Sequence, residues 1–189
     1  MSKVAKAAVG LMAATLVAKI LGFGRELALA SAYGASGVSD AFLVAMNIPA
    51  VIFTAIGTSL GTAFIPLYCE VNANKGEQSS NKFTNNVFNI VVIICIVISV
   101  IGAIFTPQIV KIFAVGFEGE TLRLAIYFTR VMILGLAFLG MSYIMMAYLQ
   151  VKENFIIPGF MSVPYNILII ISIIVSVKIS PYLLPWGTL

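Results

Sequence analysis

The sequence predicts an all-α integral membrane protein, with about five transmembrane helices and the possible start of a sixth in one transmembrane region over residues 1–189. Hydrophobic residues make up 61% of the 189-residue chain and charged residues only 10%, against about 25% charged residues in an ordinary soluble domain. Four windows, 41–69, 83–110, 131–151 and 154–177, contain no Asp, Glu, Lys or Arg. Since about 20 apolar residues in a helix cross the hydrocarbon layer, each window is long enough for one crossing.

The composition also excludes classes of function. The chain has no His and seven acidic residues, so the sequence offers neither a cluster of metal ligands nor a base placed to activate a nucleophile. We therefore expect no enzymatic activity, no catalytic residues, no metal and no cofactor. A net charge of +4 on so apolar a chain is mainly a signal of membrane topology, and no nucleic-acid partner is expected.

The first predicted helix covers residues 5–32 and carries three charges, Lys19, Arg25 and Glu26. A cleaved signal peptide is an alternative, because residues 30–32 read Ala-Ser-Ala after an apolar segment. The stretch 19–32 is too long and too charged for a cleavage region, which favours the membrane helix.

The second predicted helix covers residues 39–69 and follows a turn rich in Gly and Ser over 33–40. Asp40 is expected to serve as its N-cap. Pro49 is expected to bend the helix, and Gly57 and Gly61 form a G-x-x-x-G pattern that permits close helix packing.

Three more helices are predicted over 83–106, 120–149 and 155–178, the last carrying Pro158 and Pro164. The polar stretch 71–82 is the longest hydrophilic connection, and residues 109–113 are compatible with a position in the membrane interface. A sixth helix is expected to start at 185–189, where Trp186 suits an interfacial belt.

The Lys and Arg residues of the short loops favour a cytoplasmic N-terminus. With that orientation five cations lie inside and three outside: Lys3, Lys6, Lys75, Lys82 and Lys152 against Lys111, Arg123 and Lys178.

Charges within a membrane helix are costly, so Lys19, Arg25 and Glu26 are the first candidates for function. A cation held there can bind a phosphate or a carboxylate. Snorkelling to the interface is an alternative for the cations, and a structural pair of Arg25 with Glu26 or Asp40 is another. Gly22 and Gly24 lie between the charges and allow the helix to bend or another backbone to approach.

Several short motifs resemble the start of the MurJ/MviN family, the lipid II flippases of bacterial cell-wall synthesis. The matching segments are residues 21–26 (LGFGRE), 33–36 (YGAS), 39–45 (SDAFLVA), 48–49 (IP) and 62–66 (TAFIP), and 154–158 (NFIIP) resembles the family's fifth helix. The resemblance implies a multi-pass protein of the bacterial cytoplasmic membrane, with fourteen helices in two lobes around a central cavity. This chain would be the N-terminal part of the first lobe, and the missing C-terminal helices or second lobe would be its partner.

The resemblance further implies alternating-access transport of an undecaprenyl-diphosphate-linked peptidoglycan precursor, with membrane lipids around the protein. Lys19 and Arg25 would attract the diphosphate headgroup, with the acid Glu26 beside them. Phe53 and Thr54 stand where the family often carries an arginine pair, so a related exporter of other lipid-linked oligosaccharides is an alternative. A truncated or remnant membrane protein without transport of its own is another. A drug exporter is disfavoured, because many exported drugs are cations and Arg25 would repel them.

Overall fold

The computed structural model describes residues 3–154 and 156–189, so residues 1–2 and residue 155, where the fifth predicted helix begins, lie outside the described residues. Every regular element in this part of the chain is a helix, which confirms the predicted all-α class. The elements are α1 (Lys3–Tyr33), α2 (Gly37–Lys75), α3 (Glu77–Ile104), α4 (Thr106–Phe113), α5 (Gly119–Leu134), α6 (Leu136–Val151), α7 (Ile156–Phe160), α8 (Ser162–Lys178) and the 3₁₀ helix η1 (Pro181–Thr188).

Three stretches among the described residues are long and apolar enough to cross a membrane, namely α2, α3 and residues Ile157–Lys178. The bent pair α5 and α6 gives a fourth if the two helices form one span. Helix α1 is not among these stretches, and its membrane crossing stays a prediction.

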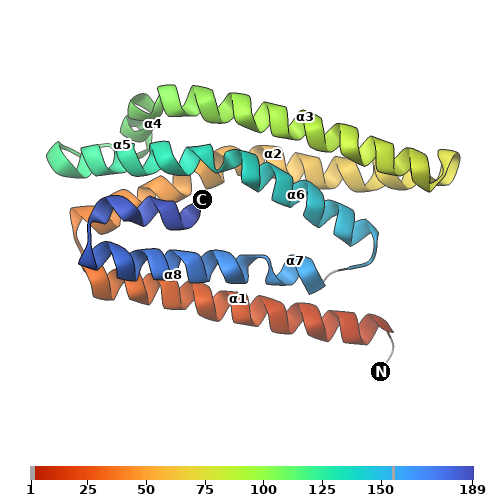
Figure 1. Cartoon of the computed structure of the whole chain (residues 1–189), viewed down its shortest axis with the longest axis horizontal. Coiled ribbons are helices and arrows are strands. Elements are labelled where there is room, and N and C mark those ends of the chain that lie inside the picture. The colour runs from red at the N-terminus through yellow and green to blue at the C-terminus, as the bar shows by residue number, and fades with distance from the viewer. Residues whose placement is uncertain (1–2, 155) are drawn as a thin grey trace.

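The helices form two layers (Figure 1). Helix α1 packs along α8 and α7, whereas α2 packs on α5 and α6, and α3 runs along α6 and α5. The layers are joined at one end by the turn between α1 and α2, where Gly34 adopts a left-handed φ of 58° that glycine tolerates without steric cost. There the Ser39 hydroxyl donates to the Gly34 carbonyl over 2.8 Å.

Several predicted boundaries differ from the structure. Helix α2 begins at Gly37 with Ser36 as N-cap, so Asp40 lies in the first turn and not at the N-cap. Its carboxylate there still faces the positive end of the helix dipole. The hydrophilic stretch 71–82 is helical except at Gly76, whose φ of 78° separates α2 from α3.

Two of the predicted helices are each divided in two. The helix expected over 120–149 bends by 42° where α5 meets α6, at Gly135, whose N–H donates to the Met132 carbonyl in a tighter turn than an α-helix makes. The helix expected over 155–178 breaks at Met161, between α7 and α8. Pro164 explains this break, because proline has no N–H to donate to the Phe160 carbonyl one turn earlier.

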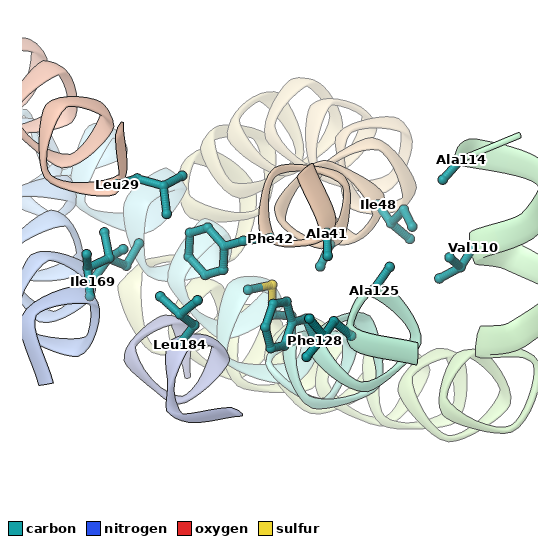
Figure 2. Close-up of a cluster of buried hydrophobic side chains, with 14 residues drawn as sticks. Leu29, Ala41, Phe42, Ile48, Val110, Ala114, Ala125, Phe128, Ile169 and Leu184 are labelled. Carbon is teal, nitrogen blue, oxygen red and sulfur yellow. The ribbon is translucent and has the colours of Figure 1, made fainter. Parts of the chain in front are cut away.

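A cluster of buried side chains holds both layers together at the end where α1 meets α2 (Figure 2). Phe42 of α2 and Phe128 of α5 lie at its centre, with ring centroids 6.2 Å apart and an edge-to-face angle of 81°. Leu29 of α1, Ile169 of α8 and Leu184 of η1 complete the contact from the other layer. One core therefore fixes how the two layers sit relative to each other.

Helices α3 and α6 approach closely because Gly140 of α6 has no side chain. A Cβ at this position would lie 2.6 Å from Cys95 Sγ and 3.3 Å from Val91 Cγ1. In a membrane, small residues of this kind allow helices to pack through van der Waals contact.

Gly140→Ala is expected to lower the free energy of unfolding by about 1–3 kcal/mol, the usual cost of overpacking a filled interface. Cys95→Ala in the same chain should recover much of this loss, because it removes the sulfur that the new methyl group meets. Gly61→Ala is the matched control, since a Cβ at Gly61 has no neighbour within 4 Å. Unfolding in detergent measures all three variants, and equal losses for the two glycines would contradict the close contact.

Candidate functional site

A cavity of about 340 Å³ lies between the two layers. Its walls come from α2, from the bent pair α5–α6, from the break between α7 and α8, and from the last turn of η1. The lining residues are Met46, Pro49, Ala50, Phe53, Thr54, Met132, Gly135, Leu139, Ser142, Tyr143, Met146, Met161, Ser162, Tyr165 and Thr188. None of these side chains is charged. Apolar surface with a few hydroxyl groups is the usual composition of a binding pocket.

The irregular points of three membrane helices meet at this cavity. Pro49 of α2, Gly135 at the α5–α6 bend and Met161 at the α7–α8 break all line it. Broken helices that surround a central cavity are typical of transporters, in which they form the binding site. Helix α2 continues through Pro49, so the proline does not end the helix.

Phe53 and Tyr143 form the aromatic part of the wall, with ring centroids 4.9 Å apart and planes inclined by 57°. Gly57 makes room for them, since a Cβ there would lie 2.7 Å from Phe53 Cε1 and 3.0 Å from Tyr143 Cε1. Gly61, in contrast, faces open space. The G-x-x-x-G pattern therefore does not act as one packing face: Gly57 admits aromatic rings, and Gly61 has no close neighbour.

Arg25 lies beside the cavity. It is on α1, which packs along α8, the helix that carries the lining residue Tyr165, and Arg25 does not itself line the cavity. Arg25 Nη2 contacts Glu26 Oε1 at 2.5 Å, and the two side chains are 20% and 47% exposed. Of the two ion pairs that the sequence allowed for Arg25, the structure contains the pair with Glu26.

Lys19 does not join this pair. It is exposed, and six positions along a continuous α-helix place it about 120° around α1 from Arg25. Helix α1 continues through Gly22 and Gly24, and a Cβ at either glycine would meet nothing within 4 Å. A bend at these glycines stays a prediction. The site as folded therefore consists of Arg25, Glu26 and the neighbouring cavity wall.

Sequence reasoning missed the side chains that make the wall, above all Tyr143, Tyr165 and the four methionines. It also missed a row of threonines on the exposed face of α2, which begins at Thr54 in the cavity. The hydroxyls of Thr54, Thr58 and Thr62 donate to the carbonyls one turn earlier over 2.6, 2.8 and 3.0 Å. The four-residue spacing was the available signal, since it places the three side chains along one face of a helix.

A second ion pair ties the ends of α3 and α6 together outside the apolar stretches. Lys152 Nζ lies 2.6 Å from Glu77 Oε1 and about 6 Å from the ring centroids of Tyr68 and Tyr148. Its hydrogen bond to Glu77 raises the pKa of Lys152 above its ordinary range. Both charges are exposed to solvent, so the pair contributes little to stability and mainly orients the two helix ends.

Apolar helices that break around a shared cavity define a multi-pass helical membrane protein. Comparison with known families gives a specific match: the family described as "Lipid II flippase MurJ" matches residues 29–189. The chain belongs to this family.

Individual relatives agree with this assignment. A probable lipid II flippase MurJ of Buchnera aphidicola subsp. Baizongia pistaciae is 30% identical over 171 residues, which cover 89% of this chain and 33% of the relative. A probable lipid II flippase MurJ of Aquifex aeolicus is 30% identical over 163 residues, 85% and 32% of the two chains. The lipid II flippase MurJ of Burkholderia cenocepacia is 27% identical over 182 residues, which cover 93% of this chain and 35% of the relative. The chain thus spans about a third of the length of these relatives.

Proposed function

We propose that this chain forms part of a lipid II flippase-like transporter, in which Arg25 binds the diphosphate of an undecaprenyl-diphosphate-linked peptidoglycan precursor. The observation that carries the proposal is a half-buried arginine on α1, beside a cavity that three broken or proline-containing helices surround. A guanidinium in a site of low dielectric binds a diphosphate through strong, charge-assisted and often bidentate hydrogen bonds.

Glu26 has a distinct role in this proposal, that of a replaceable counterion. Without substrate, it pairs with Arg25 and lowers the cost of holding the guanidinium in the membrane. A diphosphate carries more negative charge than one carboxylate, so it displaces Glu26 from Arg25. Lys19, on another face of α1, attracts the headgroup to the membrane surface and is not a direct ligand of the same phosphate.

Transport requires more than these helices. Alternating access moves two bundles against each other around a central site, and this chain corresponds to about a third of its relatives. The remaining helices, as a second lobe, are therefore the expected partner. The protein lies in the bacterial cytoplasmic membrane with its N-terminus in the cytoplasm, as the distribution of Lys and Arg in the loops favours.

A second substrate class has one specific observation in its favour. The cavity wall carries Phe53 and Thr54 and no cation, so the site next to Arg25 offers less charge for phosphate than an arginine pair would. Other lipid-linked oligosaccharides, bound through hydroxyl groups and aromatic rings, are therefore the alternative cargo.

A chimera tests the proposal, with residues 1–189 replacing the matching third of the Burkholderia cenocepacia relative. It is expressed in a strain depleted of its own lipid II flippase. The chimera is expected to restore growth, and the K19A/R25A variant is expected to fail at equal membrane abundance. R123A, which removes another exposed cation, is the control and should restore growth. Full restoration by K19A/R25A would refute the cation site, and failure of the unmodified chimera would favour a remnant without transport activity.

A further inference from the structure

Helix α4 is packed against the core at some positions and uncovered at others. Thr106 and Val110 are fully buried, and Val110 belongs to the core shared with α2 and α5. In contrast, Ile112 is 74% exposed and Val115, just past the helix, is 88% exposed. Ile104, Phe105 and Phe113 are exposed as well. Part of the apolar surface of α4 and its flanking residues is therefore left uncovered by the rest of the described chain.

The position of α4 in the fold indicates what covers this side. It follows directly on α3, one of the helices that are long enough to cross a membrane, and α5 starts a few residues after it (Figure 1). A connection between the ends of two antiparallel spans lies at the boundary between hydrocarbon and headgroups. Exposed isoleucine, valine and phenylalanine at that level suit the acyl region of the bilayer.

Cations lie next to the apolar side chains. Lys111 is exposed in the last turn of α4, and α4 carries no acidic residue. Arg130 of α5 is exposed too, and its Nε donates to the Ala103 carbonyl at the end of α3 over 3.2 Å. The acidic groups near this end, Glu118 and Glu120, are exposed at the start of α5. An apolar surface bordered by cations complements a phospholipid leaflet, in which the acyl chains lie below the phosphates.

We propose that α4 is a membrane-interface helix. The exposed apolar side chains of α4 and its flanks, namely Ile104, Phe105, Ile112, Phe113 and Val115, insert into the acyl region of one leaflet. Lys111 and Arg130 extend to the lipid phosphates of the same leaflet, and anionic lipid strengthens the insertion. This role concerns the position of α4 in the bilayer and holds whatever the protein transports.

Tryptophan fluorescence tests the insertion. The single native tryptophan is removed by W186F, and I112W or F113W is introduced into the full 189-residue chain in vesicles of phosphatidylcholine and phosphatidylglycerol. Both reporters are expected to emit at short wavelength, to lose most of their fluorescence to lipids brominated on the acyl chains and to retain most of it with aqueous iodide. Q78W is the matched control, because Gln78 is exposed in the first turn of α3. Its fluorescence should be quenched by aqueous iodide and little affected by brominated lipids.

Two results would overturn the proposal. If I112W and F113W both resemble Q78W, α4 lies in water, or another protein surface covers it without lipid contact. The second arm adds K111E to the F113W chain, which should reduce quenching by brominated lipid in phosphatidylglycerol vesicles but not in pure phosphatidylcholine. Equal quenching of the K111E chain and its parent in both lipids would refute the part of the proposal that assigns Lys111 to lipid phosphates.

Discussion

Replacing Phe128 by alanine is expected to lower the free energy of unfolding by about 3 kcal/mol, the lower part of the range for a fully buried phenylalanine. The ring is fully buried and meets Phe42 edge-on in the cluster that joins both layers. Because lipid is as apolar as the side chain, the loss comes from lost packing contacts and the cavity left behind. Phe128 is therefore expected to stabilise the packing of α1 and α8 against α2 and α5.

Phe138→Ala provides the comparison for this prediction. Phe138 is on α6 and 59% exposed, so lipid or detergent takes the place of its ring and the expected loss is small. Both variants are measured by unfolding in detergent micelles at one lipid and detergent concentration. A loss for F128A no larger than for F138A would mean that the Phe42–Phe128 cluster does not stabilise the fold.

The second large effect is expected on ligand binding. Arg25→Ala should weaken binding of undecaprenyl diphosphate about tenfold to a hundredfold, which corresponds to the loss of a hydrogen bond to a charged group. Arg25→Lys should lie between the wild-type chain and R25A, because lysine keeps the charge but not the planar pair of donors. Native mass spectrometry of the chain in nanodiscs measures the three dissociation constants.

Arg123→Ala is the charge-matched control for R25A, since it removes a cation that lies on α5 and does not line the cavity. Its dissociation constant should equal that of the wild-type chain. If R25A and R123A weaken binding equally, attraction by net charge explains the affinity, and Arg25 is not a specific ligand.

The fold was predictable in outline because a membrane imposes simple requirements. Charge-free windows of at least 20 residues specify helices, and the order of these helices follows from the loops between them. Their number differs, because α4 is a separate helix and two predicted helices are divided. The break at Gly135 was not predictable, because glycine is common inside membrane helices and a single one seldom bends them. Pro164 gave a clearer signal, since a missing N–H always leaves a carbonyl without its helical partner.

The candidate site was also predictable only in part. Arg25 and Glu26 were predictable because charge inside an apolar segment is costly wherever the segment packs. Tyr143 and Tyr165 were not, because they are on different helices and line one cavity only once the chain has folded. The G-x-x-x-G spacing places Gly57 and Gly61 on one helix face. It does not indicate that only Gly57 has close neighbours.

The Arg25–Glu26 site is tested most directly by titrating the E26Q chain with undecaprenyl diphosphate. If Glu26 is a counterion that the diphosphate displaces, E26Q should bind about two- to fivefold more tightly than the wild-type chain, since a partly exposed ion pair is worth up to ~1 kcal/mol. The gain should vanish in the R25A background, where no pair exists. Two results would contradict diphosphate recognition by this ion pair. One is that E26Q binds the diphosphate no more tightly than the wild-type chain. The other is that E26Q tightens binding equally in the R25A background.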